Sequence, residues 1–186
     1  MQPVGRSLGR IGLTPNEITT LSMIVAVLAG FAYASRNPVI GAVGLLASGA
    51  IDMLDGAVAR ATGSVTSFGA VYDPVLDRYA EFAVLLGIGL GGFAAWTWVV
   101  FSLFGMVMAS YTRARAESAG GLESCRVGIA ERQEKIILLV IGSFLQPFFS
   151  LAVPLAVLLV GILSHITVVQ RLHFTFTHTR GGQTHV

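Results

Sequence analysis

Four aspartates lie within residues 52–77 of this 186-residue chain, between two long apolar runs. Asp52 and Asp55 are about 60° apart on one helix face, since each helical residue advances about 100°. Asp73 and Asp77 are spaced i,i+4 and share a face of the next helix. Converging carboxylates of this kind bind Mg²⁺ or Mn²⁺, and paired ions promote displacement at phosphorus. We therefore expect these four residues to bind Mg²⁺ or Mn²⁺.

The charges of these aspartates require a partner. Carboxylates that converge to near 4 Å repel by roughly 4 kcal/mol per pair at an effective dielectric constant of 20. Arg60 and Arg78 are close enough in sequence to neutralise at most two of them. An ion-paired polar plug between helices, or aspartates that cap helix ends, would explain one or two of the four. A site for metal ions explains all of them.

Small residues and one arginine accompany the first two aspartates. Gly56 lies one helical turn after Asp52, and Ala59 one turn after Asp55, so this face has little side-chain bulk. A pyrophosphate could approach the helix closely there. Arg60 lies one turn after Gly56 and could bind the phosphate oxygens through its forked guanidinium.

The composition is typical of an integral membrane protein. The chain is 54% hydrophobic and 12% charged, with a mean hydropathy of +0.74. A membrane-spanning helix needs about 20 apolar residues. We expect an all-α membrane protein with one domain over residues 1–186 and a short N-terminal interfacial helix over residues 3–13. Six runs could span the membrane: residues 17–35, 38–59, 72–93, 95–112, 134–152 and 154–170.

The charge distribution predicts the orientation in the membrane. With six spans, every basic residue except Arg36 lies on the side that also holds both termini. The positive-inside rule makes that side cytoplasmic. All the acidic residues also lie on or near this side, although acids do not determine topology. The chain is therefore expected to be a multi-pass protein of the cell membrane, with one working face toward the cytoplasm.

The aspartate segment also resembles a known family signature. The run Asp52-x2-Asp55-Gly56-x2-Ala59-Arg60-x8-Gly69-x3-Asp73-x3-Asp77 is similar to the complete motif of the CDP-alcohol phosphatidyltransferases. The resemblance implies a six-helix membrane enzyme, usually a homodimer, with a dinuclear metal site in a cavity open to the cytoplasm. Such enzymes displace CMP from a CDP-linked lipid with the hydroxyl of a small alcohol.

The resemblance also implies roles for individual residues. Asp52, Asp55, Asp73 and Asp77 would be metal ligands, and Asp77 would also be the general base. For Asn16, Thr19 and Thr66, helix capping is the alternative role. The predicted site for the CDP-lipid consists of Asn16, Thr19, Asp52, Gly56, Ala59, Arg60, Thr66 and Gly69.

Further segments resemble the subgroup that makes phosphatidylinositol phosphate or its archaeal ether-lipid counterpart. They are "YTRARAESAG", "GIAERQEK" and "VQRLH", and Lys135 stands where some relatives have a second arginine. The acceptor is therefore expected to be inositol 1-phosphate, with glycerol 3-phosphate or another small alcohol as alternatives. The donor could be CDP-diacylglycerol or CDP-archaeol. The predicted acceptor-phosphate site consists of Arg113, Arg115, Arg132, Lys135 and Arg171, a clustering that positive-inside topology would also favour.

Two other classes of protein compete with the enzyme. A divalent-cation channel or transporter could place aspartates at its mouth, but its polar residues should then continue across the membrane. Helices 38–59 and 72–93 are instead almost wholly apolar from Ala50 and from Phe82 to the ends that lie away from the aspartates. A structural membrane scaffold would need no metal site. No nucleic-acid-binding module is expected, and the tail "HFTFTHTRGGQTHV" is expected to be loosely ordered.

Overall fold

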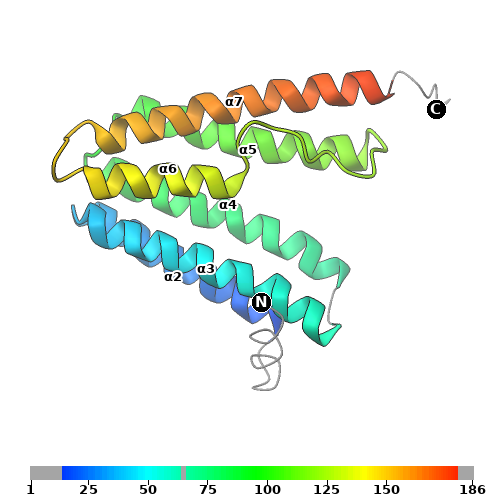
Figure 1. Cartoon of the computed structure of the whole chain (residues 1–186), viewed down its shortest axis with the longest axis horizontal. Helices are drawn as coiled ribbons and strands as arrows, with labels where there is room; N and C mark the ends of the chain where they lie inside the picture. Colours follow the sequence, from blue (N-terminus) through cyan, green and yellow to red (C-terminus); the bar gives the residue numbers. More distant parts are fainter. Residues whose placement is uncertain (1–13, 64–65, 180–186) are drawn as a thin grey trace.

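A computed structural model describes residues 14–63 and 66–179, and all regular secondary structure within them is helical (Figure 1). Three of these helices, α2, α3 and α7, are long and apolar enough to cross a membrane. The interfacial segment expected over residues 3–13 lies outside the described residues. The helices are α2 (Pro15–Ala34), α3 (Pro38–Thr62), α4 (Ser67–Leu90), α5 (Trp96–Ser118), α6 (Arg132–Leu145) and α7 (Ala152–Thr179).

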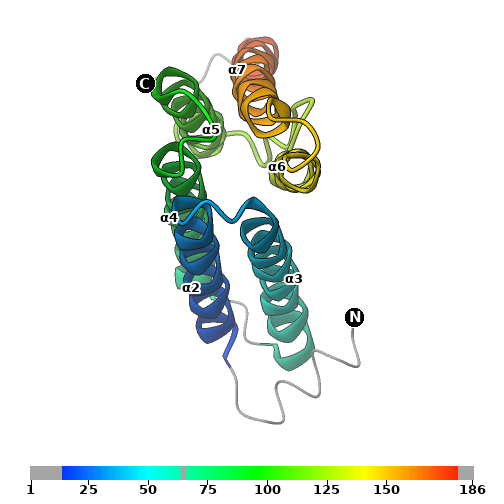
Figure 2. The same ribbon diagram turned by 90° about the vertical axis from the view of Figure 1, so that its left-hand side faces the viewer.

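Successive helices run in opposite directions along the molecule (Figure 1). The starts of α2, α4 and α6 and the ends of α3, α5 and α7 therefore lie toward one end, on the right in this view. Helices α2–α4 form one group and α5–α7 another, and Figure 2 shows the two groups one above the other. Contacts of α3 with α6 and of α4 with α5 join the groups. This topology brings the charged segments of the chain to one end.

Local signals determine where the helices near that end begin. Thr14 caps α2 in a capping box, in which Glu17 N–H donates to Thr14 Oγ1 and Thr14 N–H donates to Glu17 Oε2. Thr66 caps α4 by accepting a hydrogen bond from Gly69 N–H at 3.0 Å. Capping is thus the observed role of Thr66, whereas Thr14 rather than Asn16 caps α2.

Several predicted helix bounds were wrong. The run 134–152 breaks at Leu145, because Gln146 accepts from Val153 N–H and donates to the Ser150 carbonyl, which stabilises a turn. The tail expected to be loosely ordered is helical to Thr179 within α7. Hydroxyls there, such as Thr175 Oγ1, donate to carbonyls four residues earlier.

Pro74 lies inside α4 rather than in its first turn, because the Thr66 cap starts this helix about five residues earlier than expected. Proline has no N–H to donate, so the carbonyl of Ala70 loses its helical partner at this point. Pro74 immediately follows Asp73, so this irregularity lies beside one of the predicted metal ligands.

Glycines allow the backbones of α2 and α4 to pack in direct contact. A Cβ at Gly87 would lie 2.1 Å from the carbonyl oxygen of Gly30, and a Cβ at Gly30 would lie 2.4 Å from that of Ala83. Small residues at such crossings are typical of helices that associate in lipid. A buried hydrogen bond between Tyr33 and Ser143, at 2.7 Å, also links α2 to α6. These contacts fix α2 and α4 relative to each other.

This packing predicts the effect of a single methyl group. Gly87→Ala should lower the free energy of unfolding by about 1–3 kcal/mol, because the added Cβ would overlap the Gly30 backbone. Gly49→Ala is the matched control, since its Cβ would meet only Ile136 Cδ1, at 3.9 Å. Thermal unfolding in detergent measures both variants. Equal melting temperatures for the two would contradict the close α2–α4 contact.

Candidate active site

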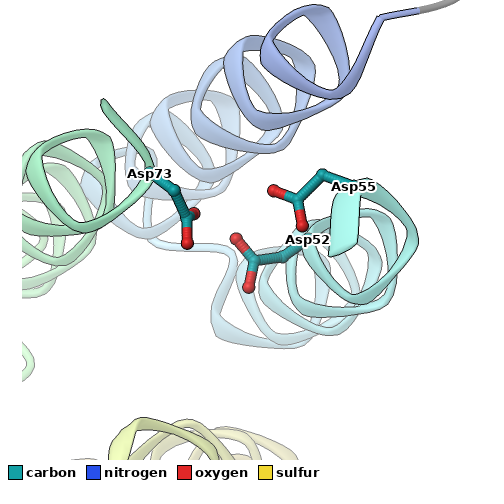
Figure 3. Close-up of side chains that lie close together, drawn as sticks. All are labelled: Asp52, Asp55 and Asp73. Carbon is teal, nitrogen blue, oxygen red and sulfur yellow. The ribbon is translucent and has the colours of Figure 1, made fainter. Parts of the chain in front are cut away.

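Three of the predicted metal ligands converge between α3 and α4. One carboxylate oxygen from each of Asp52, Asp55 and Asp73, the three-aspartate group, lies within 4.8 Å of the other two. Figure 3 shows the carboxylate of Asp73 directed toward those of Asp52 and Asp55. In the described part of the chain, Asp52 Oδ1 and Asp73 Oδ1 are buried without a hydrogen-bond partner. Buried, unpaired carboxylate oxygens suit a hard divalent cation.

Asp77, the fourth predicted ligand, is engaged by an arginine from α6. Arg132 Nη2 lies 2.8 Å from Asp77 Oδ1, and Arg132 Nη1 donates to Asp52 Oδ2. Arg132 was predicted to bind the acceptor's phosphate, and in the structure it pairs with Asp52 and Asp77 and also lines the cavity described below. The Arg132 guanidinium therefore neutralises part of the negative charge of the aspartates. It comes from α6, which lies outside the aspartate motif of residues 52–77.

Residues predicted to bind the nucleotide lie beside the aspartates. Thr19 Oγ1 donates to Asp55 Oδ2 at 2.7 Å, and Thr19 is only 4% exposed. A Cβ at Gly69 would lie 3.2 Å from Thr66 Oγ1 and 3.4 Å from Asn16 Oδ1, so these three residues are neighbours. The starts of α2 and α4 therefore bring together polar groups from segments 50 residues apart in sequence.

Gly56 and Arg60 also lie in contact. A Cβ at Gly56 would be 3.1 Å from Arg60 Nη1, so the guanidinium extends back along the glycine toward the aspartates. Arg60 is exposed, while Ala59 and Gly56 are half-buried. The Arg60 guanidinium therefore lies over a face of α3 that carries only small residues, as the spacing of the motif indicated.

A cavity of about 530 Å³ lies next to the aspartates, between α4, α5, α6 and α7. Its lining combines carboxylates with cations, so it suits a polar anion that also carries hydroxyls. Arg115 does not line it in the described structure, because it lies two positions beyond Arg113, on the other side of α5, and its side chain is exposed. The charged lining residues are Asp73, Asp77, Arg78, Glu81, Arg113, Glu117, Glu131, Arg132, Lys135 and Arg171.

Two of the cavity arginines are held in place by α5 and by the segment that connects it to α6. Arg113 Nε donates to Glu117 Oε1 at 3.0 Å, and the same oxygen accepts from Cys125 N–H at 3.0 Å. Arg171 donates from Nε to the Val127 carbonyl and from Nη1 to that of Ala109. The remaining guanidinium donors of each arginine are available to a ligand.

Glu81 is a lining residue that the sequence analysis missed. It is 8% exposed, and Arg78 Nη1 lies 2.8 Å from its Oε2. Arg78 Nη1 also donates to Ser110 Oγ on α5 at 2.7 Å. Glu81 follows Asp77 by four residues and so continues the acidic face of α4. That spacing was the signal that could have identified it.

Comparisons with known proteins agree with this geometry. Residues 12–177 match the family described as CDP-alcohol phosphatidyltransferase. The chain is 39% identical to the archaetidylinositol phosphate synthase of Pyrococcus horikoshii, over 93% of this chain and 89% of that protein. It is 36% identical to the phosphatidylinositol phosphate synthase of Mycobacteroides abscessus, over 92% of this chain and 81% of that protein.

Solved structures give the same result. The crystal structure of Mycobacterium tuberculosis phosphatidylinositol phosphate synthase with CDP-DAG bound superposes with a TM-score of 0.85 at 33% identity, covering 95% of this chain and 93% of that chain. The structure of the same protein in complex with manganese and citrate gives a TM-score of 0.84, covering 95% and 88%. Because the two proteins are 33% identical, they are similar in sequence as well as in fold.

The aspartate cluster predicts measurable metal binding. Asp55→Asn should weaken Mn²⁺ binding at least tenfold, because a neutral amide replaces a charged oxygen ligand. A tenfold change in affinity corresponds to about 1.4 kcal/mol, and an interaction with a charged group is typically worth about 1.5–3 kcal/mol. Glu123→Gln is the control, since it removes a carboxylate from the exposed loop. The electron paramagnetic resonance signal of free Mn²⁺ reports both affinities. If the two variants bound Mn²⁺ equally well, the cluster would not be the metal site.

Proposed function

Because the chain belongs to the CDP-alcohol phosphatidyltransferase family, we propose that it transfers a phosphatidyl-type or archaetidyl group from a CDP-linked lipid to inositol 1-phosphate. CMP is the other product. The observation that carries this proposal is the junction of two sites: an aspartate cluster between α3 and α4 opens onto a cavity lined by cations from α5, α6 and α7. One site suits a pyrophosphate with its metal ions, and the other suits a phosphorylated alcohol.

The reaction is an in-line displacement at the lipid-side phosphorus of the CDP-lipid. Asp52, Asp55 and Asp73, together with Asp77, would hold Mg²⁺ or Mn²⁺, which would polarise the pyrophosphate and neutralise charge on the departing CMP. Asp77 lines the cavity and takes the proton of the attacking hydroxyl. The new bond joins the alcohol oxygen to phosphorus, and the bond from that phosphorus to the CMP oxygen breaks.

The donor site uses the residues around the aspartates. Asn16, Thr66 and Gly69 form one edge of the nucleotide site, and Thr19 fixes the orientation of Asp55 through its 2.7 Å hydrogen bond. Gly56 lets the pyrophosphate approach α3, where Arg60 binds its oxygens. The lipid part of the donor, diacylglycerol or archaeol, extends into the surrounding bilayer.

The acceptor's phosphate binds among the cavity cations. Lys135 and Arg171 are 5% and 6% exposed, so a phosphate beside them is largely shielded from water and its attraction to them is strengthened. Arg113 and Arg132 complete this set. Glycerol 3-phosphate carries the same phosphate group and is the alternative acceptor.

All six helical segments cross the cell membrane in this proposal, α6 together with residues 146–151 that follow it, and both termini are cytoplasmic. In support, the functional groups gather at the end where α2, α4 and α6 begin, while Arg36 lies in the turn at the opposite end. The exposed apolar side chains along the helices, such as Leu28, Phe31 and Leu159, suit contact with lipid or a second subunit. The active unit is a homodimer, as the family resemblance implies.

The proposed base gives a prediction for catalysis. Asp77→Asn should lower turnover by about 10²–10⁴-fold, because the amide cannot accept the hydroxyl proton. Release of CMP from CDP-diacylglycerol and from CDP-archaeol measures turnover, and elution in size-exclusion chromatography shows that the fold is intact. Near wild-type turnover would remove Asp77 from the mechanism.

The cavity gives a prediction for the acceptor. Arg113→Ala should raise the KM for inositol 1-phosphate about tenfold or more while leaving CDP-lipid binding little changed, since a charge-assisted hydrogen bond is worth about 1.5–3 kcal/mol. Arg115→Ala is the matched control, because it removes the same side chain from the exposed side of α5. Free inositol and serine should drive little CMP release. If they were as effective as inositol 1-phosphate, the acceptor would not be selected by its phosphate.

A further inference from the structure

Arg132 joins the two sites directly. It is the first residue of α6, and its two terminal nitrogens contact carboxylates on different helices, Asp52 on α3 and Asp77 on α4. The same side chain lines the cavity that contains Lys135 and Arg171. No other arginine in the described residues is ion-paired both to a member of the three-aspartate group and to the proposed base.

We propose that Arg132 couples metal binding to acceptor binding, by leaving Asp52 and Asp77 for the acceptor's phosphate when a divalent cation binds the aspartates. This inference rests on the proposed function and concerns the same site. A guanidinium bound to Asp52 and a cation bound to Asp52 share one carboxylate and repel each other. Each therefore weakens the binding of the other.

The contacts of Arg132 favour such a movement. Its Nε is buried without a hydrogen-bond partner among the described residues, so the observed position leaves one donor of a charged group unsatisfied. The Arg132 side chain is 19% exposed and lines the cavity, whereas Lys135 and Arg171 are buried. A phosphate placed beside those two cations offers oxygens to the whole fork of Arg132.

Coupling of this kind is reciprocal. If a divalent cation frees Arg132 for the acceptor, then an acceptor that holds Arg132 must raise the affinity for the cation by the same factor. The acceptor site would then be weak before the metal and its CDP-lipid are in place. The enzyme would avoid filling its cavity with inositol phosphate while the reactive pyrophosphate is missing.

Mn²⁺ binding tests the competition without measuring catalysis. Arg132→Gln should bind Mn²⁺ about tenfold more tightly than wild type, which corresponds to losing one competing hydrogen bond between charged groups. Arg113→Gln is the matched control, because it removes the same charge from the same cavity but pairs with Glu117. Its Mn²⁺ affinity should change much less. Unchanged or weaker Mn²⁺ binding by a folded Arg132→Gln would overturn the proposal, as would equal gains in both variants.

A second variant covers the case in which Arg132→Gln does not fold. Arg132→Lys keeps the charge but has no fork to hold two carboxylates at once, so its Mn²⁺ affinity should lie between wild type and the expected gain. Elution in size-exclusion chromatography establishes folding for each protein. An Arg132→Lys protein with wild-type Mn²⁺ affinity would overturn the proposal in that case.

The acceptor provides the reciprocal measurement. Saturating inositol 1-phosphate should tighten Mn²⁺ binding to the wild type, and inositol should not. In Arg132→Gln saturated with inositol 1-phosphate, this gain should be lost, whereas a phosphate that binds the metal directly would preserve it and overturn the proposal. CMP release by the wild type tests the proposed function separately. Turnover with no Mn²⁺ coupling would reject the role of Arg132 alone.

Discussion

Repulsion among carboxylates at the α3–α4 interface is the constraint on which the rest of this structure depends. Asp52, Asp55 and Asp73 lie within 4.8 Å of one another, and Asp77 and Glu81 extend the negative charge along α4. A low-dielectric surrounding makes such a group costly unless cations compensate it. Arg78 on α4 pairs with Glu81, and Arg132 on α6 pairs with Asp52 and Asp77, so the second half of the chain helps to complete an electrostatic unit that the first half begins.

The alternating helix directions satisfy this requirement with short connections. Each odd-numbered helix returns the chain to the end where the next even-numbered helix begins, so charged segments far apart in sequence meet at one end (Figure 1). The opposite end consists of short turns, such as that at Asn37-Pro38, and carries none of the site. A single polar end on an otherwise apolar bundle is also what insertion into a bilayer favours.

Local spacing predicted more of the site than of its surroundings. The i,i+3 spacing placed Asp52 and Asp55 on one face of α3 because that distance is a property of a helix, whereas the approach of Asp73 from α4 depends on helix packing and was expected from the family motif. The partnership of Arg132 with Asp52 crosses 80 residues and depends on how α6 packs, which no periodicity encodes. The early end of α6 at Leu145 was missed for a related reason, since side-chain hydrogen bonds from Gln146 rather than hydrophobicity stop the helix.

The backbone contact between Gly30 and Gly87 has a consequence for how this enzyme family can diversify. Together with the Ser22–Ser48 hydrogen bonds, it makes α2, α3 and α4 one tightly joined body that carries the three-aspartate group and the residues proposed to bind the nucleotide. The cavity proposed for the acceptor takes most of its basic residues from α5, α6 and α7. Substitutions in those three helices can therefore change which alcohol is accepted while the donor half keeps its geometry. Family members that share this division can therefore attach different head groups to the same kind of lipid donor.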